Sequence, residues 1–398
     1  MAQRPVAPTP PIPEDGRSLD LDWVRRALAA GGRLALPTGI RIEEVGVGSG
    51  VMGQVMRCHL DYGESNDSAP ASIIVKLPSV NAKTRRLGKR LLLYRREYDF
   101  YRTLASRIPV STPRLLYGDF EPKSHRFALV LEDIRGMAVV DQIAGASPAQ
   151  AKRAIRALAR MHGAYWNRTR EAPVSGSYDS NNPKLSPIVQ VVYLANLVRT
   201  LKHFGDAFSS TTRPLAEAFG LGVVDHMAAL GAGPRTFTHG DYRLDNLFFG
   251  DGGDDGVTVI DWQVSGLSCG LYDVGYFLAG NLTAPVRRQI ERDAVEEYHD
   301  IVCRSGAVDF TFDECWRMYR QNTLAALLTS VIVCGGLDLD DDRSRRLAEV
   351  GLKRSLAAIE DLDVAEFIPD RSRPSRNRRL FTHACRIAYG AYRSYKGI

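Results

Sequence analysis

The chain has 398 residues, of which 44% are hydrophobic and 25% are charged, a composition typical of a globular protein and unlike that of disordered or collagen-like chains. The formal net charge is +6, yet eight of the 52 basic residues follow Asp370 and no acidic residue does. Without these eight, 44 basic residues face 46 acidic ones. The positive charge is therefore concentrated at the C-terminus, and the bulk composition gives no reason to expect specific nucleic-acid binding.

The sequence carries no recognisable targeting segment. No apolar run approaches the roughly 20 residues that a membrane-spanning helix needs, and the first residues lead into prolines instead of an apolar stretch. None of the six cysteines forms a Cys-x-x-Cys pair, and the histidines and cysteines lack the spacing of zinc ligands. These features predict a reduced, cytoplasmic protein without a transmembrane segment.

The first third of the chain reads as a strand-rich lobe. Residues 1–17 contain five prolines and are expected to form a disordered arm. A helix with Leu21, Val24 and Leu28 on one face should follow and end at Gly31 and Gly32. Strands are predicted over residues 42–47, 51–60, 71–77, 115–120 and 127–131, and one long helix over residues 83–106.

Helical patterns dominate the rest of the chain. Helices are predicted over residues 148–165, 188–204, 276–282, 285–305, 312–333 and 344–359, and strands only at 248–249 and 257–260. The expected fold class is α+β, with a small antiparallel-sheet lobe over residues 18–133 and a large helical lobe over residues 134–370. Residues 371–398 form a separate basic segment.

The strongest chemical signal lies in the segment His239-Gly240-Asp241 and the residues that follow it. Asn246 comes five residues after Asp241, and Asp261 comes twenty residues after it, at the end of an apolar strand. One carboxylate able to accept a proton, together with an amide oxygen and a second carboxylate, suits a site for magnesium and ATP. The alternative is a polar hairpin whose carboxylates cap turns.

These residues resemble the motifs of the aminoglycoside phosphotransferase and choline kinase group. The resemblance implies a bilobal protein-kinase-like fold, with Asp241 as the catalytic base and with Asn246 and Asp261 holding Mg²⁺. Trp262 stands where protein kinases have the phenylalanine of Asp-Phe-Gly, and His-Gly-Asp replaces their His-Arg-Asp. Both departures favour small molecules over proteins as substrates.

A glycine-rich turn between two predicted strands could cradle the phosphates of ATP, because glycine lets backbone N–H groups approach phosphate oxygens. Its candidate binding residues are Gly46, Gly48, Ser49, Gly50 and Gly53. Their spacing departs from the usual Gly-x-Gly-x-x-Gly, and a flexible hairpin turn is the alternative.

Lys76 lies inside an apolar strand, where an unpaired charge would be costly. Glu97 on the following helix is its natural partner, as in the kinase pair in which a lysine binds the phosphates and a glutamate orients it. The alternative is a solvent-exposed lysine and an unrelated surface glutamate. By resemblance alone, Glu132 and Asp133 fall in the segment that joins the lobes and holds the adenine.

Other polar residues near the motifs are assigned structural roles. His239 is expected to be buried and to hold the loop by hydrogen bonds, and His162 to be a satisfied core histidine. Asp273 should cap a helix and brace the catalytic loop. Gly266 to Gly270 fits the Gly-x-Ser-x-Gly pattern of hydrolases, but the C-terminal half lacks the alternating strands that a hydrolase needs.

The predicted function is transfer of the ATP γ-phosphate to a hydroxyl of a small molecule, with Mg²⁺ as cofactor. The resemblance implies that residues between His162 and His239 bind the acceptor. From 176 to 235 this segment has four acids and five bases, and its stretch Pro187 to Leu194 is apolar. A polycationic aminoglycoside would favour an excess of acids, so a neutral or apolar alcohol is preferred, and Leu131-Glu132-Asp133 also resembles the ecdysteroid-kinase-like branch.

Three alternatives remain open. A cationic acceptor such as an aminoglycoside or choline would suit the four acids between Asp338 and Asp342. An ATP-binding pseudokinase or scaffold is the alternative from a different class of protein. The two basic runs, residues 83–96 and 371–398, are either solvated helix faces or contacts for phosphates, a membrane surface or an anionic partner.

Overall fold

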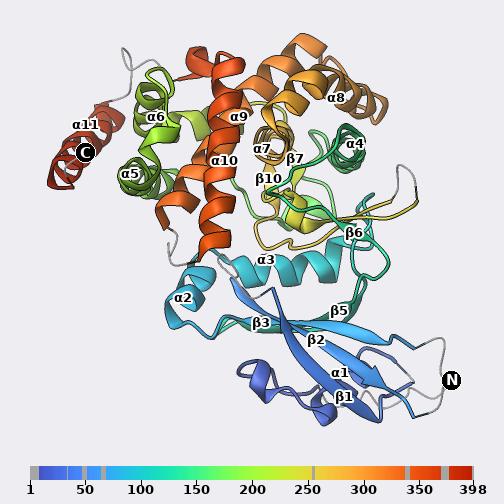
Figure 1. Ribbon diagram of the computed structural model, residues 1–398. Helices are drawn as coiled ribbons and strands as arrows, with labels where there is room; N and C mark the ends of the chain where they lie inside the picture. Colours follow the sequence, from blue (N-terminus) through green and yellow to red (C-terminus); the bar gives the residue numbers. More distant parts are fainter. Residues whose placement is uncertain are drawn as a thin grey trace. The chain divides into compact units, whose positions relative to one another are not determined.

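The computed structural model describes residues 9–33, 35–46, 52–63, 69–252, 256–336, 341–368 and 376–396. The chain forms two compact units: unit 1 contains Met1–Met137 and Thr258–Ser265, and unit 2 contains Ala138–Val257 and Gly266–Ile398 (Figure 1). The division falls at residue 137, four residues beyond the predicted end of the first lobe. Residues 258–265 belong to unit 1, although residues 239–246, which precede them in the sequence, belong to unit 2.

Unit 1 is built on a five-stranded antiparallel sheet in the order β1-β2-β3-β5-β4 (Figure 1). The strands are β1 (Gly39–Val45), β2 (Gly53–Asp61), β3 (Ser72–Pro78), β4 (Leu115–Glu121) and β5 (Arg126–Glu132). Each predicted strand of the first lobe is therefore present, with ends shifted by a few residues. The central strand β3 pairs Val55 of β2 and Leu129 of β5 with Lys76.

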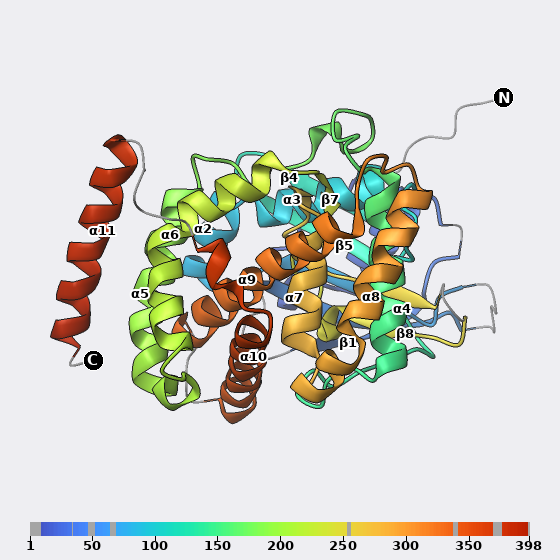
Figure 2. The same cartoon turned by 90° about the horizontal axis from the view of Figure 1, so that it is seen from above.

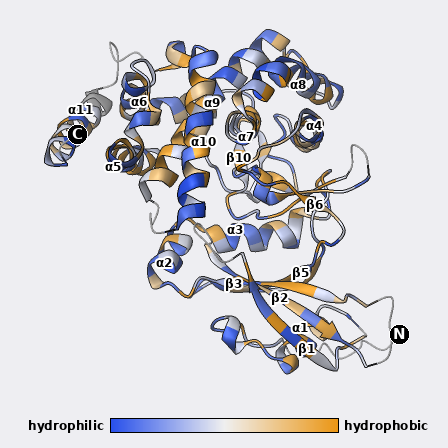
Figure 3. Cartoon of the chain, viewed as in Figure 1, coloured by the Kyte–Doolittle hydropathy of each residue, from blue (hydrophilic) through white to orange (hydrophobic). Residues whose placement is uncertain are grey.

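The alternation of side chains along β3 gives the sheet two different faces. Ile73, Val75 and Leu77 pack with helix α1 (Leu21–Ala30) in a buried core. On the opposite face Lys76 meets helix α3 (Leu93–Asp99). The neighbouring strand β5 is buried from residue 127 to 131 and appears hydrophobic in Figure 3, as expected of a strand covered on both faces.

The long helix predicted over residues 83–106 is interrupted. The structure has α2 (Ala82–Arg90), then α3, then a π-helical turn (Phe100–Leu104). Leu92 breaks the helix because it adopts a left-handed conformation with φ of 59°. The apolar periodicity is the same on both sides of this break, so the sequence pattern did not reveal it.

Residues 1–17 were predicted to be a disordered arm, but residues 9–17, the part that the structure describes, are ordered. Residues 9–17 lie against the sheet of unit 1: the Trp23 indole donates to the Pro11 carbonyl at 2.8 Å, and the Gly16 amide donates to Gln54 at 2.8 Å. Because prolines restrict the unfolded chain, a proline-rich segment loses less conformational entropy when it becomes ordered.

Unit 2 is mainly helical, and its helices are seen end-on and side-on in Figures 1 and 2. They are α4 (Pro148–Ala164), α5 (Ser186–Phe204), α6 (Thr212–Ala232), α7 (Leu271–Asn281), α8 (Ala284–Arg304), α9 (Phe312–Gly336), α10 (Asp342–Asp361) and α11 (Arg376–Tyr395). The basic segment thus contains a helix, α11, which packs beside α5 and α6. The Arg393 guanidinium on α11 pairs with Glu217 at 2.8 Å.

Short strands support the loops of unit 2. β7 (Thr236–Thr238) pairs antiparallel with β10 (Gly266–Ser268), and β6 (Ala138–Val139) pairs antiparallel with β8 (Leu247–Phe249). The chain passes from unit 2 back to unit 1 within β9 (Val257–Val259). β8 and β9 were predicted, whereas β6, β7 and β10 are too short to leave a periodic signal.

Helix α6 was not predicted. Its apolar residues have no single stripe, and glycines interrupt it. At Gly220 an added Cβ would lie 2.7 Å from side-chain atoms of Leu194 and Tyr193 on α5, so the glycine permits close packing of the two helices. Among the described helices, α6 alone is long and apolar enough to cross a membrane by length and composition; 44% of its apolar window is buried, as in the core helix of a globular protein.

Candidate functional site

The residues from His239 to Asn246 follow β7 and form a tight loop, which hydrogen bonds to buried side chains hold in place. Gly240 has a φ of +83°, a conformation that favours glycine. The Asp273 carboxylate accepts the backbone N–H groups of His239, at 2.7 Å, and of Gly240, at 2.8 Å. His239 is fully buried and its Nδ1 accepts the Asp241 N–H at 3.2 Å. The predicted structural role of His239 is confirmed.

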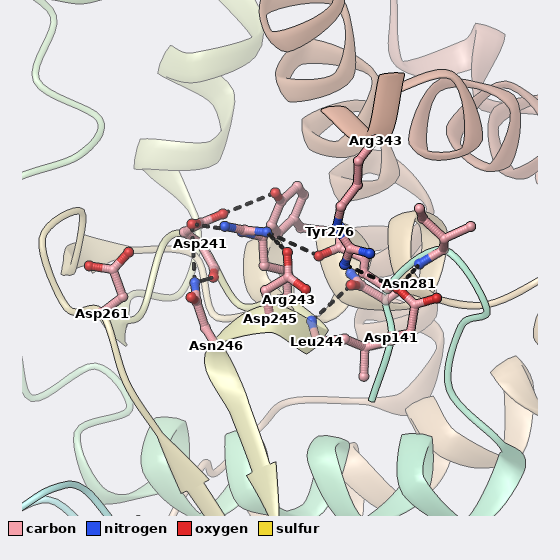
Figure 4. Close-up of polar contacts among 12 residues, drawn as sticks. Asp141, Asp241, Arg243, Leu244, Asp245, Asn246, Asp261, Tyr276, Asn281 and Arg343 are labelled. Atoms are coloured by element: carbon pink, nitrogen blue, oxygen red, sulfur yellow. Dashed lines mark hydrogen bonds and ion pairs between the residues drawn. The ribbon is translucent and has the colours of Figure 1, made fainter. Parts of the chain in front are cut away.

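The side chain of Asp241 is held by three donors (Figure 4). Its Oδ1 accepts the Tyr276 hydroxyl at 3.0 Å. Its Oδ2 accepts Nε of Arg243 and Nδ2 of Asn246, each at 3.2 Å. The carboxylate is still about one quarter exposed. A fixed, partly accessible carboxylate can take a proton from a substrate hydroxyl.

Arg243 links Asp241 to the rest of the loop. Its guanidinium also pairs with Asp245 and donates to Gln142 at 3.1 Å. Burial opposes its charge, but its neighbours, chiefly the Asp241 and Asp245 carboxylates, together outweigh this effect, so the pKa of Arg243 is raised and the group stays cationic. The loop therefore carries a permanent positive charge beside its carboxylates.

Asn246 has the orientation that a magnesium ligand requires. Its amide N–H₂ donates to the Asp241 carbonyl at 2.9 Å and to the Asp241 carboxylate. Because both partners are acceptors, the nitrogen must face them and Oδ1 must point the other way. Amide and carboxylate oxygens suit Mg²⁺, which usually binds few protein ligands and completes its shell with phosphates and water. Asn246 therefore fits the predicted role.

The described ranges contain no group of three or more His, Cys, Asp or Glu side chains that could hold a metal ion.

Unit 1 brings together Lys76, Glu97 and Asp261. The Lys76 ammonium pairs with Glu97 of α3 and lies 3.0 Å from Oδ1 of Asp261. Burial would lower the pKa of Lys76, but the two carboxylates outweigh it and the pKa is raised. The pKa of Glu97 is also raised, in this case by burial. Because Lys76 faces two carboxylates whereas Glu97 faces one cation, we conclude that the lysine stays charged. The predicted pairing of Lys76 with Glu97 is confirmed.

Asp261 is placed by an unusual backbone and a packed neighbour. Its φ is +63°, a conformation that Asp adopts more readily than bulky residues do. Trp262 is fully buried and stacks on Phe100 with ring centroids 3.9 Å apart. Nε of Arg96 donates to the Ser265 carbonyl at 2.9 Å. Arg96, the last residue of the basic run 83–96, thus holds the Asp261 segment instead of facing solvent.

The glycine-rich turn is described only at its two ends. Gly48, Ser49 and Gly50 lie outside the described residues. Gly46 has a φ of +72°, as expected for a turn glycine. Gly53 begins β2, where an added Cβ would lie 2.5 Å from the Leu77 carbonyl oxygen. Close pairing of β2 and β3 therefore accounts for Gly53, and its contact with phosphate stays a prediction.

The side chains of Glu132 and Asp133 are engaged within unit 1. Asp133 is almost fully buried and pairs with Nε of Arg57 on β2 at 3.0 Å, while Ser72 also donates to it. Glu132 accepts the backbone N–H of Arg114 at 3.2 Å. These contacts give both carboxylates a structural role. The predicted role of the two residues in nucleotide binding therefore stays a prediction from resemblance.

The remaining polar predictions have mixed outcomes. His162 is fully buried and hydrogen-bonds the Tyr298 hydroxyl and Asp273, which confirms a satisfied core histidine. Asp273 braces the loop as predicted, but it does not cap α7, whose N-cap is Gly270. Ser268 of the hydrolase-like pattern is buried within β10 and donates to Asn181 at 2.9 Å. It is not an exposed nucleophile on a turn.

Sequence reasoning missed the residues of α7 that contact the loop beyond Asp273. Tyr276 reaches Asp241, and Oδ1 of Asn281 accepts the Leu244 N–H at 3.0 Å. The one available signal was the presence of a tyrosine and an asparagine in an otherwise apolar helix, where buried polar groups need partners.

The sequence matches the model of one protein family, and the fold resembles those of several solved structures. The model of the phosphotransferase enzyme family matches residues 73–306, which is more than half of the chain. No curated protein matches the sequence. A microcompartment-associated aminopropanol kinase has a TM-score of 0.50 at 15% identity, with 86% of this chain and 98% of that chain covered.

Two further solved structures have similar extents. One from Ralstonia eutropha, a candidate aminoglycoside phosphotransferase, has a TM-score of 0.50 at 15% identity and covers 87% of this chain and 97% of its own. An ethanolamine kinase from Plasmodium vivax has a TM-score of 0.49 at 12% identity, with 89% of this chain and 90% of that chain covered. The likeness to the two structures with a TM-score of 0.50 shows the kinase-like fold. The family match over residues 73–306 shows that the chain belongs to the phosphotransferase enzyme family.

Proposed function

We propose that this phosphotransferase moves the γ-phosphate of ATP to a hydroxyl of a neutral or apolar small molecule, with Asp241 as the base. The acceptor oxygen forms a bond to the γ-phosphorus while the bond from that phosphorus to the bridging oxygen of ADP breaks. The hydroxyl proton goes to Asp241. The observation that carries the proposal is the Asp241 carboxylate, fixed by three donors and still accessible.

Charge neutralisation is the second requirement of phosphoryl transfer. Lys76, held by Glu97 and Asp261, is a permanent cation suited to phosphate oxygens. We assign Asn246 and Asp261 as the protein ligands of Mg²⁺, which when bound neutralises charge on the transferring phosphoryl group. The glycine-rich turn is proposed to contact the phosphates.

The acceptor is inferred from α5. Three apolar residues on this helix are exposed: Ile188 at 40%, Val191 at 51% and Val192 at 38%. Their spacing of three and four residues places them on one side of the helix. An exposed apolar stripe in the segment assigned to the acceptor favours an apolar ligand surface.

The acids nearby are less available to a polycation than their number suggests. Asp179 pairs with Arg235, and Glu217 pairs with Arg393. Asp341 of the predicted acidic cluster accepts from Ser344 at the start of α10, whereas 337–340 lie outside the described residues. Ion-paired carboxylates attract a cationic aminoglycoside weakly, which supports the neutral or apolar acceptor.

The test uses purified protein with ATP and a panel of acceptors: sterol-like and macrolide-like alcohols, choline and an aminoglycoside. ADP release and phosphorylated product are measured with Mg²⁺ and with EDTA. Asp241→Asn should lower kcat by about 10² to 10⁴-fold with ATP affinity retained, and Asp245→Asn, in the same loop, should have a much smaller effect. Full activity of Asp241→Asn would exclude Asp241 as the base, and ATP binding without turnover of any acceptor would favour a pseudokinase.

The basic C-terminal segment is proposed to contact an anionic surface or partner, and the protein to act in the cytoplasm. Arg386 on α11 and Lys396, directly after this helix, are exposed. Removal of residues 371–398 should weaken retention on vesicles that contain anionic lipid, measured by co-sedimentation against neutral vesicles. Unchanged retention would assign the segment to packing on α5 and α6 alone.

A further inference from the structure

Helix α7 contacts the loop of the proposed base at three successive points. Asp273 accepts the backbone N–H groups of His239 and Gly240. One turn later, Tyr276 donates to the side chain of Asp241. Near the end of the helix, Asn281 accepts the Leu244 N–H. The backbone contacts shape the loop, and Tyr276 contacts the carboxylate that would receive the proton (Figure 4).

The acceptor positions of the Asp241 carboxylate are nearly filled. A carboxylate has about four positions for hydrogen-bond donors, two on each oxygen. Among the described residues, Oδ2 accepts from both Arg243 and Asn246, whereas Oδ1 accepts from Tyr276 alone. The remaining position is therefore on Oδ1, beside the Tyr276 hydroxyl.

We propose that Tyr276 is a positioning residue, which fixes Oδ1 of Asp241 so that the acceptor hydroxyl donates to that same oxygen. This inference rests on the proposed role of Asp241 as the base. Without Tyr276, Oδ1 would lose the one donor that the described part of the chain gives it. The carboxylate would then be held only through Oδ2, by Arg243 and Asn246.

The surroundings of Tyr276 suit this task. Tyr276 is 9% exposed and packs with Ala279, Ala326 and Ala358, which come from α7, α9 and α10. Three small side chains leave the large ring little freedom, because protein interiors are closely packed. Burial and the adjacent Asp241 raise the pKa of Tyr276 well above its ordinary value, so the hydroxyl keeps its proton and remains a donor.

The decisive variant is Tyr276→Phe, which keeps the ring and removes the hydroxyl. We expect kcat to fall by about tenfold to a hundredfold, as for the loss of one hydrogen bond to a charged group, while KM for ATP stays within twofold. Tyr276→Met, which also lacks the hydroxyl, should likewise lower kcat and leave KM for ATP nearly unchanged. In an Asp241→Asn background, Tyr276→Phe should cause no further loss of kcat.

Tyr319→Phe is the matched control. The Tyr319 hydroxyl is buried and donates to the Glu291 carboxylate at 2.9 Å, so this variant loses the same kind of bond on α9, away from the loop, and should keep the kcat of the unaltered protein. If Tyr276→Phe keeps that kcat as well, or if both variants lose activity in proportion to their loss of Tm, the positioning role is overturned. If Asp241→Asn is fully active, the proposed base itself fails, and the positioning role fails with it.

Discussion

Nζ of Lys76 lies 3.0 Å from Oδ1 of Asp261, although 185 residues separate them in the sequence. Both residues belong to unit 1, because residues 258–265 return to it between the two parts of unit 2, Ala138–Val257 and Gly266–Ile398. Glu97 completes the group from α3. The two carboxylates hold the Lys76 ammonium in place, which would reduce the entropy lost when Lys76 binds phosphates in its proposed role.

Replacement of Lys76 by Met should weaken both stability and nucleotide binding. The change leaves the buried Glu97 without its cation, and breaking a buried pair from one side costs about 3–5 kcal/mol of the free energy of unfolding. Urea unfolding and ATP titration measure the two effects. The double variant Lys76→Met with Glu97→Met should regain much of the stability and none of the ATP affinity. Equal stability of Lys76→Met and the unaltered protein would contradict the buried pair.

Replacement of Asp273 by Asn should disturb the catalytic loop. Both oxygens of Asp273 accept backbone N–H groups, and an amide offers one oxygen only, so that one buried N–H loses its partner at a cost of about 1–3 kcal/mol. We expect lower kcat together with lower Tm. Asp313, in the first turn of α9, is exposed, and Asp313→Asn should change the free energy of unfolding by less than about 0.5 kcal/mol. Similar effects of the two variants would argue against a bracing role for Asp273.

Asp133 should make the stability of unit 1 sensitive to acid. Burial alone would raise its pKa, but the hydrogen bond from Ser72 and the Arg57 guanidinium outweigh it, and the pKa is lowered. A lowered pKa in the folded state stabilises the protein above the ordinary value of Asp, about 3.9, and this contribution is lost as pH falls through the folded value.

Asp133→Asn should therefore reduce the free energy of unfolding at pH 7 and flatten its decline below about pH 4. Denaturant unfolding from pH 2 to pH 7 follows both effects. ATP affinity should be retained in folded Asp133→Asn, since the carboxylate is occupied by Arg57 and Ser72. A selective loss of ATP affinity would instead support the nucleotide-binding role predicted by resemblance.

The sequence alone identified the elements whose signal is local. Apolar runs bounded by turn residues located the strands of unit 1, and the spacing of His239, Asp241 and Asn246 located the loop. The same reasoning missed α6, whose glycines and lack of one apolar stripe hide its period, and joined α2 to α3, because a single left-handed residue such as Leu92 leaves the apolar spacing unchanged.

Tertiary structure decided which side chains meet. The sequence by itself determined that Lys76 needs a partner, because unpaired buried charge is costly. It also predicted the loop that carries Asp241, because that motif is contiguous. Only the fold showed that Asp133 is bound by Arg57 and that Tyr276 holds Asp241. Hydrogen bonds between distant residues depend on the packing of whole helices and strands, and a one-dimensional pattern carries no record of that geometry.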